Sequence, residues 1–119
     1  MPASQSRLRI VDVNGVTRVE FLDRNILDEA NIQQIGEEIG RVVDGQVQPK
    51  LLISFGNVDH LSSAALGTLI TLRHKVDAKD GQLRLSDIKP QIHTVFEITK
   101  LTRLFHIHET AADALKSFA

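Results

Sequence analysis

Two adjacent serines, Ser62 and Ser63, stand between an apolar run and a helix-like run in the segment VDHLSSAALGTLI, residues 58–70. A serine hydroxyl at the start of a helix accepts a hydrogen bond from an unpaired backbone N–H, so either serine suits a helix cap. A serine beside a helix N-terminus is also a good place to add and remove a phosphate, because the backbone donors there favour negative charge. The segment by itself leaves both roles open.

The histidines are the other residues that could carry chemistry, and there are five of them. His106 and His108 are two apart in a predicted strand and would point the same way, but no third ligand stands at a metal-site spacing. Asp59, His60 and Ser63 lie too close in sequence for a strand, turn and helix to present them as a catalytic triad. The chain also has neither a G-x-S-x-G elbow nor a glycine-rich phosphate loop. We therefore expect no metal, no cofactor and no enzyme activity of its own.

The composition narrows the classes of partner. Fourteen Lys and Arg against 15 Asp and Glu give a net charge of -1, which argues against a basic surface for nucleic acid or an anionic membrane. Cysteine is absent from the sequence, which excludes disulfides, thiolate catalysis and cysteine-based zinc sites. The segment MPASQSR lacks an apolar signal region, and no run approaches the roughly 20 apolar residues of a membrane span. These features predict a cytoplasmic protein that binds another folded protein.

The hydrophobic pattern of the first half predicts three strands and two helices. Asn14-Gly15 between two β-branched runs is typical of a hairpin, and Asp28 is placed to cap a helix that ends at Asp44-Gly45. The apolar run LLISF lacks alternation, as expected for a central strand covered on both faces and parallel to its neighbour. The second helix follows the two serines and ends near Asp80-Gly81. The predicted strands cover residues 8–13, 16–22 and 51–55.

The second half continues the alternation of strands and helices. QLRLSDI (82–88) reads as a strand, Pro90 suits the start of a helix, and LFHIH (104–108) reads as the last strand. Thr110 is placed to cap a short final helix. The predicted order is β-β-α-β-α-β-α-β-α, a single α/β domain over residues 1–119 with a mixed, mostly parallel sheet and about four helices. Such units close right-handed, so Asp28 and the two serines should lie near one edge of the sheet.

Several blocks of the sequence together resemble a known family. The chain is similar, over nearly its whole length, to the STAS domain of bacterial anti-sigma-factor antagonists. The blocks that carry the resemblance are LLISFGNVDHL, SSAALGTLI, QLRLSDIKPQI and VFEITKLTRLFHIHETAADAL.

The resemblance assigns roles to individual residues. In the family, an Asp-Ser-Ser-Gly-Leu-Gly segment opens the second helix, and its first serine is phosphorylated by a kinase that is also the anti-sigma factor. Laying Leu66-Gly67 on the Leu-Gly of that motif places the acceptor at Ser63, with Ser62 in the position of the preceding Asp. Ser62 is therefore a cap or an alternate acceptor. The implied partner surface contains the acceptor, its neighbours and the loop aspartate before the first helix: Asp28, Ser62, Ser63, Ala64, Leu66 and Gly67.

The resemblance implies two functions of different kinds. In the first, the protein is an anti-sigma-factor antagonist. It binds an anti-sigma factor that is also a serine kinase, and its phosphorylation causes the complex to dissociate. ATP would then belong to the kinase. In the second, it is a STAS scaffold or interaction module that binds partners, or itself, without phosphorylation. Gly67 inside the second helix permits close approach by a partner or by the sheet.

Overall fold

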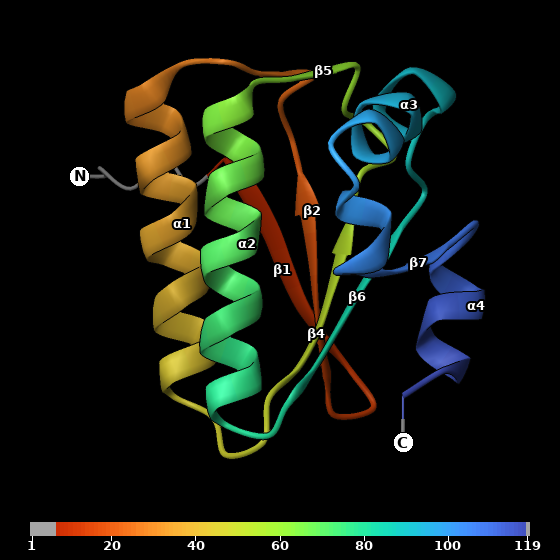
Figure 1. Ribbon diagram of the computed structural model, residues 1–119. Coiled ribbons are helices and arrows are strands. Elements are labelled where there is room, and N and C mark those ends of the chain that lie inside the picture. The colour runs from red at the N-terminus through yellow and green to blue at the C-terminus, as the bar shows by residue number, and fades with distance from the viewer. Residues whose placement is uncertain (1–6, 119) are drawn as a thin grey trace.

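The computed structural model describes residues 7–118 and shows a five-stranded sheet with helices on both faces (Figure 1). The strand order is β1-β2-β4-β6-β7. Strand β1 pairs antiparallel with β2, whereas the pairs β2–β4, β4–β6 and β6–β7 are parallel. The predicted mixed, mostly parallel sheet is therefore confirmed. Its strands are β1 (Leu8–Val13), β2 (Val16–Phe21), β4 (Lys50–Ser54), β6 (Gln82–Ser86) and β7 (His106–His108).

Among residues 7–118, α1, α2 and α3 lie between strands and α4 follows the last strand. Helices α1, α3 and α4 begin where the sequence predicts, and α2 begins one residue earlier than predicted, at Ser63. Helices α1 and α2 lie side by side along one face of the sheet (Figure 1). Asp28 caps α1, Thr110 caps α4, and Pro90 is the first residue of α3. The helices are α1 (Glu29–Asp44), α2 (Ser63–Ala78), α3 (Pro90–Ile98) and α4 (Ala111–Lys116).

Some strand ends differ from the predicted bounds, since β2 ends at Phe21 instead of residue 22 and β6 ends at Ser86 instead of residue 88. Two larger features also depart from the prediction. Two extra strands of two residues each, β3 (Asn25–Ile26) and β5 (His60–Leu61), pair with each other as a separate ribbon. The last strand starts at His106 instead of residue 104, and a short 3-10 helix, η1 (Leu101–Arg103), precedes it. The apolar residues between α3 and β7 pack in the core instead of joining the sheet, since Leu101 and Phe105 are buried.

The core confirms that the run LLISF is a central strand. Leu52 and Ile53 are both completely buried, because Ile53 faces the main core and Leu52 faces α4 on the other side of the sheet. A line of aromatic rings runs through the main core, with centroids 5.2 to 6.3 Å apart, and ties the sheet to α3 and β7. The rings belong to Phe21, Phe55, Phe96 and Phe105.

Candidate functional site

The short β3–β5 ribbon brings the N-termini of α1 and α2 together. Ile26 pairs with Leu61, and the backbone N–H of Ser62 donates to the carbonyl of Ile26 at 3.1 Å. Asp28 follows two residues after Ile26, so both helices start at the same end of the sheet (Figure 1). Asp28 and the two serines therefore lie at one edge of the sheet, as predicted, and the β3–β5 ribbon connects the segments that carry them.

The two serines have different structural roles. The Ser62 hydroxyl accepts a hydrogen bond from the backbone N–H of Ala65 at 3.3 Å, so Ser62 is the cap of α2. Ser63 is the first residue of the helix, and its side chain is exposed. Asp28 is the corresponding cap of α1 and accepts from the N–H of Asn31 at 3.2 Å. The Ser63 hydroxyl is thus exposed in the first turn of α2 without serving as its cap.

Five of the six residues predicted to contact a partner reach the surface. Asp28, Ser63, Ala64 and Gly67 are exposed, and Ser62 is half-buried. The exception is Leu66, which is only 6% exposed and packs in the main core. In the structure of the chain alone, the Leu66 side chain therefore holds α2 against the sheet, and its predicted contact with a partner stays a prediction.

The glycine at position 67 faces open space. A Cβ atom added to Gly67 would meet no atom within 4 Å, so packing against the sheet does not explain this glycine. At Gly36 of α1, by contrast, an added Cβ would come within 2.9 Å of the Thr68 methyl group, because α1 and α2 pack closely there. Gly67 and Ala64 line a shallow recess of about 480 Å³ between the two helices. The absence of a side chain at Gly67 and the single methyl group of Ala64 leave room for a partner's backbone or side chains.

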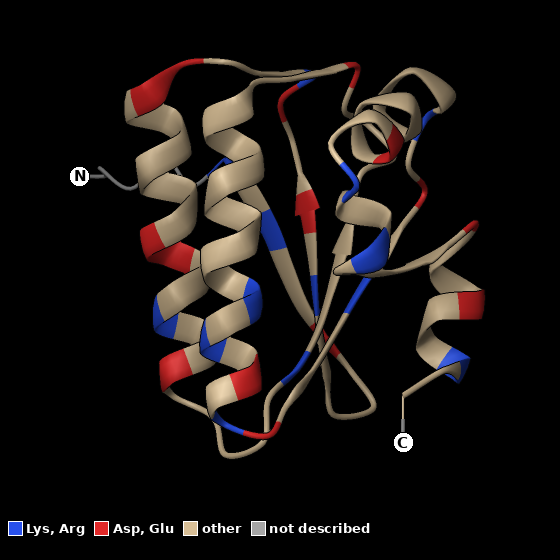
Figure 2. Ribbon diagram, in the orientation of Figure 1, with Lys and Arg blue, Asp and Glu red and all other residues tan. Residues whose placement is uncertain are grey.

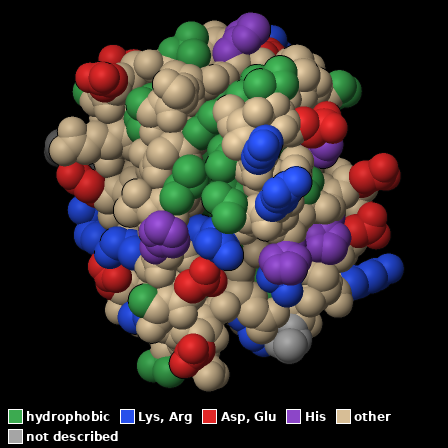
Figure 3. All heavy atoms as spheres, viewed as in Figure 1, with side chains coloured by type: hydrophobic (Ala, Val, Ile, Leu, Met, Phe, Trp, Pro, Cys, Tyr) green, Lys and Arg blue, Asp and Glu red, His purple; other side chains and the backbone are tan. Residues whose placement is uncertain are grey.

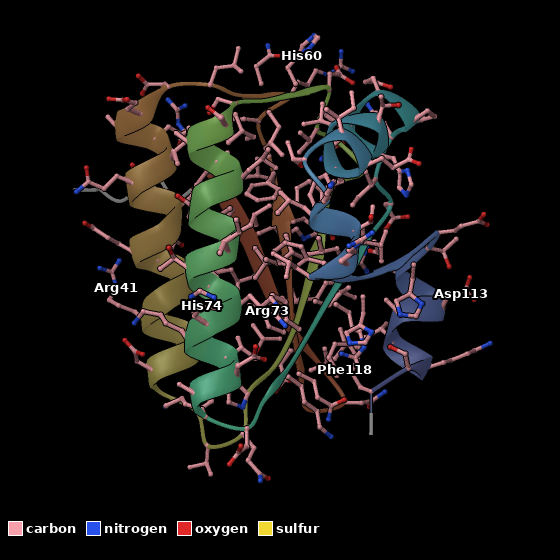
Figure 4. The ribbon with its side chains drawn as sticks, in the orientation of Figure 1. Arg41, His60, Arg73, His74, Asp113 and Phe118 are labelled. Carbon is pink, nitrogen blue, oxygen red and sulfur yellow. The ribbon has the colours of Figure 1, made fainter. Side chains whose placement is uncertain are left out.

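An ion pair fixes the loop that leads into α2. The Lys89 ammonium, at the start of α3, donates to the Asp59 carboxylate, which lies just before β5. This hydrogen bond lowers the pKa of the Asp59 carboxyl, and the charges of Arg24 and His60 act in the same direction. The backbone N–H groups of Asp59 and His60 donate to the Arg24 carbonyl at 2.7 and 3.2 Å. His60, the first residue of β5, is exposed at the top of the view in Figure 4.

The sequence pattern did not reveal the Asp59–Lys89 pair or the ribbon. The paired residues are 30 apart in sequence, and strands of two residues are too short to show an alternating pattern. Among residues 7–118, no three His, Cys, Asp or Glu side chains gather in a group that could hold a metal ion. His106 and His108 do face the same side of the sheet, in line with Arg84 and Ser86 of β6. Within the same residues, no helix has the length and apolar character needed to cross a membrane.

Several known proteins of similar sequence or structure are described as anti-sigma factor antagonists. The chain is 28% identical over 97 residues to a Bordetella bronchiseptica protein named as the anti-sigma factor antagonist BtrV, covering 79% of this chain and 83% of that protein. Its fold matches an anti-sigma-factor antagonist (STAS) domain protein from Planctomyces limnophilus with a TM-score of 0.86 at 20% identity, covering 98% and 100% of the two chains. The Bacillus cell fate determinant SpoIIAA in its phosphorylated form matches with a TM-score of 0.70 at 17% identity, over 92% and 96%.

A family model matches nearly the whole of the chain. The model of the STAS domain matches residues 8–114, which run from β1 into α4 and include the N-termini of α1 and α2. This match agrees with the resemblance in the sequence blocks and with the observed fold. The protein belongs to the STAS domain family.

Proposed function

We propose that this protein is an anti-sigma-factor antagonist that binds an anti-sigma factor with serine kinase activity and is released when Ser63 is phosphorylated. The observation that carries the proposal is the exposed hydroxyl of Ser63 in the first turn of α2. It lies beside the exposed recess of Ala64 and Gly67, and the ribbon brings it near Asp28. The name of the Bordetella relative and the phosphorylated form of SpoIIAA support this reading.

The switch would act through charge at the partner surface. The kinase transfers the terminal phosphoryl group of ATP to the Ser63 oxygen, which loses its proton, and ADP is released. The new group carries a charge of about -1.5 to -2. The N-terminus of α2 accommodates this charge, because its backbone N–H groups and its dipole favour an anion. The fold therefore stays intact while the exposed surface becomes more negative.

In this proposal, the protein is a regulator and not an enzyme. ATP and the catalytic groups belong to the kinase, and the whole chain, residues 1–119, acts in the cytoplasm as a single STAS domain. The proposed partner contacts are those of Asp28, Ser62, Ser63, Ala64, Leu66 and Gly67, of which Leu66 is the most buried. Ser62 is the alternate acceptor, with the constraint that its hydroxyl already caps α2.

One observation favours a second function, that of a scaffold that works without phosphorylation. The family motif has an aspartate before the acceptor serine, and this chain has Ser62, a neutral cap, at that position. A kinase that reads the carboxylate would not recognise the site. The same surface would then bind partners, or a second copy of the chain, permanently.

The deciding experiment combines phosphorylation and binding. The purified protein is incubated with ATP and the serine kinase anti-sigma factor of its own organism, and mass spectrometry locates any phosphate. Isothermal titration then compares wild type, Ser63→Ala, Ser63→Asp and, as a neighbouring control, Ser62→Asp. We expect phosphate on Ser63, weaker binding of Ser63→Asp, and retained binding of Ser63→Ala. Absence of phosphate together with equal affinities for all four proteins would refute the switch and favour the scaffold.

A further inference from the structure

The flank of α2 that faces α3 carries residues that the core does not use. At 100° per residue, the core stripe of α2 runs through Leu69 and Leu72, and Ile70 lies about a quarter turn to one side. Ser63 falls on that same side, two turns before Ile70. Ile70 is only half-buried and packs against the edge of the main core. The acceptor serine and an apolar side chain therefore share one flank of the helix.

Helix α3 and the segment after it supply the opposite wall. His93, Thr94 and Glu97 line a cavity on the β7 side of α3. At 100° per residue, Val95 lies opposite His93, and Ile98 lies between Val95 and Thr94 on the outer surface of the helix. Val95 is half-buried, whereas Ile98 is 76% exposed. Figure 3 shows hydrophobic side chains gathered between α2 and the α3–η1 segment. We call this surface the α2–α3 strip and define it by Ile70, Val95, Ile98 and Leu104.

Basic residues border the strip. Lys100 and Arg103 are exposed on the η1 side, and Arg73 projects from α2 toward η1 (Figures 2 and 4). Arg73 has an acidic neighbour, Asp77, whose carboxylate lies 3.6 Å away. Glu97 lies on the far side of α3 and makes a 3.1 Å contact with His93. The edges of the strip are therefore predominantly positive, although the protein as a whole has a net charge of -1.

A cavity of about 250 Å³ lies next to Arg73 and Leu104, toward the start of β7. Arg84 and His106 also line it. The hydrogen bonds of the Arg84 guanidinium go to neutral oxygens of Ser117, Leu83 and Gln82, at 2.9 to 3.2 Å. Burial lowers the pKa of the Arg84 guanidinium, which also lies 5.2 Å from the ring centroid of Phe118. Asp77 lines the same cavity and pairs with Arg73, so this cavity already contains a carboxylate of the protein's own.

We propose that the α2–α3 strip is a docking surface for an amphipathic helix of a protein partner that carries acidic residues along the edges of its apolar face. This inference rests on the proposed function for the identity of the partner, an anti-sigma factor, and adds its mode of binding. Leucine-like side chains of the helix contact Ile70, Val95 and Ile98. Its carboxylates pair with Arg73, Lys100 and Arg103, and the charge complementarity selects it over a basic helix.

The position of Ser63 connects this surface to regulation. Ten residues of α2 separate Ser63 from Arg73, which corresponds to about 15 Å, or about three turns of a docked helix. A phosphate on Ser63 would therefore stand at one end of the docked helix and repel its acidic edges. Phosphorylation would weaken binding without any change in the strip.

The test uses two synthetic helices of 16 residues with the same leucine stripe at i, i+3, i+4 and i+7. One carries Glu beside the stripe and the other carries Lys. Fluorescence anisotropy measures their affinities, and amide chemical shifts of the ¹⁵N-labelled protein locate the contact. We expect the Glu helix to bind at least about tenfold more tightly than the Lys helix, because edge charges set specificity. The shifts should centre on Ile70, Val95 and Ile98.

Matched variants locate the effect. Ile98→Asp and Arg103→Glu should each weaken binding of the Glu helix by about tenfold. Val47→Asp, at a residue that is 93% exposed after α1, and Arg41→Glu, on the outer part of α1, should change it less than about twofold. Equal binding of the two helices, shifts centred elsewhere, or unchanged affinity in Arg103→Glu would overturn the proposal. Neither peptide assay involves ATP or a kinase. The binding of the two helices therefore tests the docking surface even if Ser63 turns out not to be phosphorylated.

Discussion

Replacing the two serines one at a time should separate helix capping from switching. Ser62 caps α2 through its bond to the Ala65 N–H, whereas Ser63 stands in the first turn with an exposed side chain. Loss of a cap hydroxyl costs about 1 kcal/mol. Ser62→Ala should therefore destabilise the protein, and Ser63→Ala should leave its stability nearly unchanged. Ser63→Asp places a negative charge at the positive end of α2 and should stabilise the helix by about 0.3–1 kcal/mol.

These energies convert to measurable shifts in melting temperature. An unfolding entropy of about 2.1 cal/mol/K per residue gives about 0.25 kcal/mol/K for a chain of 119 residues. The melting temperature of Ser62→Ala should then fall by about 4 °C, and that of Ser63→Ala by less than about 1 °C. That of Ser63→Asp should rise by about 1–4 °C at low salt, with a smaller rise at 0.5 M salt because the charge is screened.

Circular dichroism melts at the two salt concentrations provide the measurement, with titration against the kinase as the functional readout. The distinctive expectation is that Ser63→Asp is more stable than wild type and yet binds the kinase more weakly. Weak binding of this variant would then not arise from unfolding. A melting temperature that falls in Ser63→Ala as far as in Ser62→Ala, or that falls in Ser63→Asp, would show that the assignment of cap and acceptor is wrong.

The remaining predictions concern single contacts. Gly67→Ala should stabilise α2 by about 1 kcal/mol, since an added Cβ meets no atom within 4 Å, and weaken kinase binding if the partner occupies the recess; thermal melts and titration check both effects. Asp28→Ala should cost about 1 kcal/mol by loss of the α1 cap in denaturant titration, and unchanged kinase affinity at a matched folded fraction would remove Asp28 from the partner surface. Leu52→Ala should cost about 2–5 kcal/mol in the same titration, because its side chain is fully buried beneath α4. The pKa of Asp59 lies below its ordinary value of 3.8, so its pair with Lys89 stabilises the fold above pH 3.8. This stabilisation is lost as the pH falls through the pKa of Asp59 in the folded protein. Carboxyl NMR titration of Lys89→Gln should show the pKa of Asp59 moving up toward 3.8.

The sequence predicted those features that depend on interactions between near neighbours. Asn14 and Gly15 take positive φ angles of 53° and 87°, as their types suit, and the hairpin follows from this turn. The caps Asp28 and Thr110 bond to N–H groups three residues away, so the residue type alone marks the helix start. The uninterrupted run of apolar residues likewise sufficed to place β4 in the centre of the sheet.

The tertiary structure decided the features that depend on contacts across long stretches of chain. Either serine could cap a helix, and only the position of the backbone fixed by the Ile26–Ser62 hydrogen bond assigns the cap to Ser62 and leaves Ser63 exposed. Leu66 matches the family motif in sequence, but packing against the sheet buries it. The α2–α3 strip joins residues of α2 with residues about 25 positions later, and no local pattern marks them as neighbours. Helical periodicity tells which residues share one face, but the neighbour of that face is set by the packing of the whole chain.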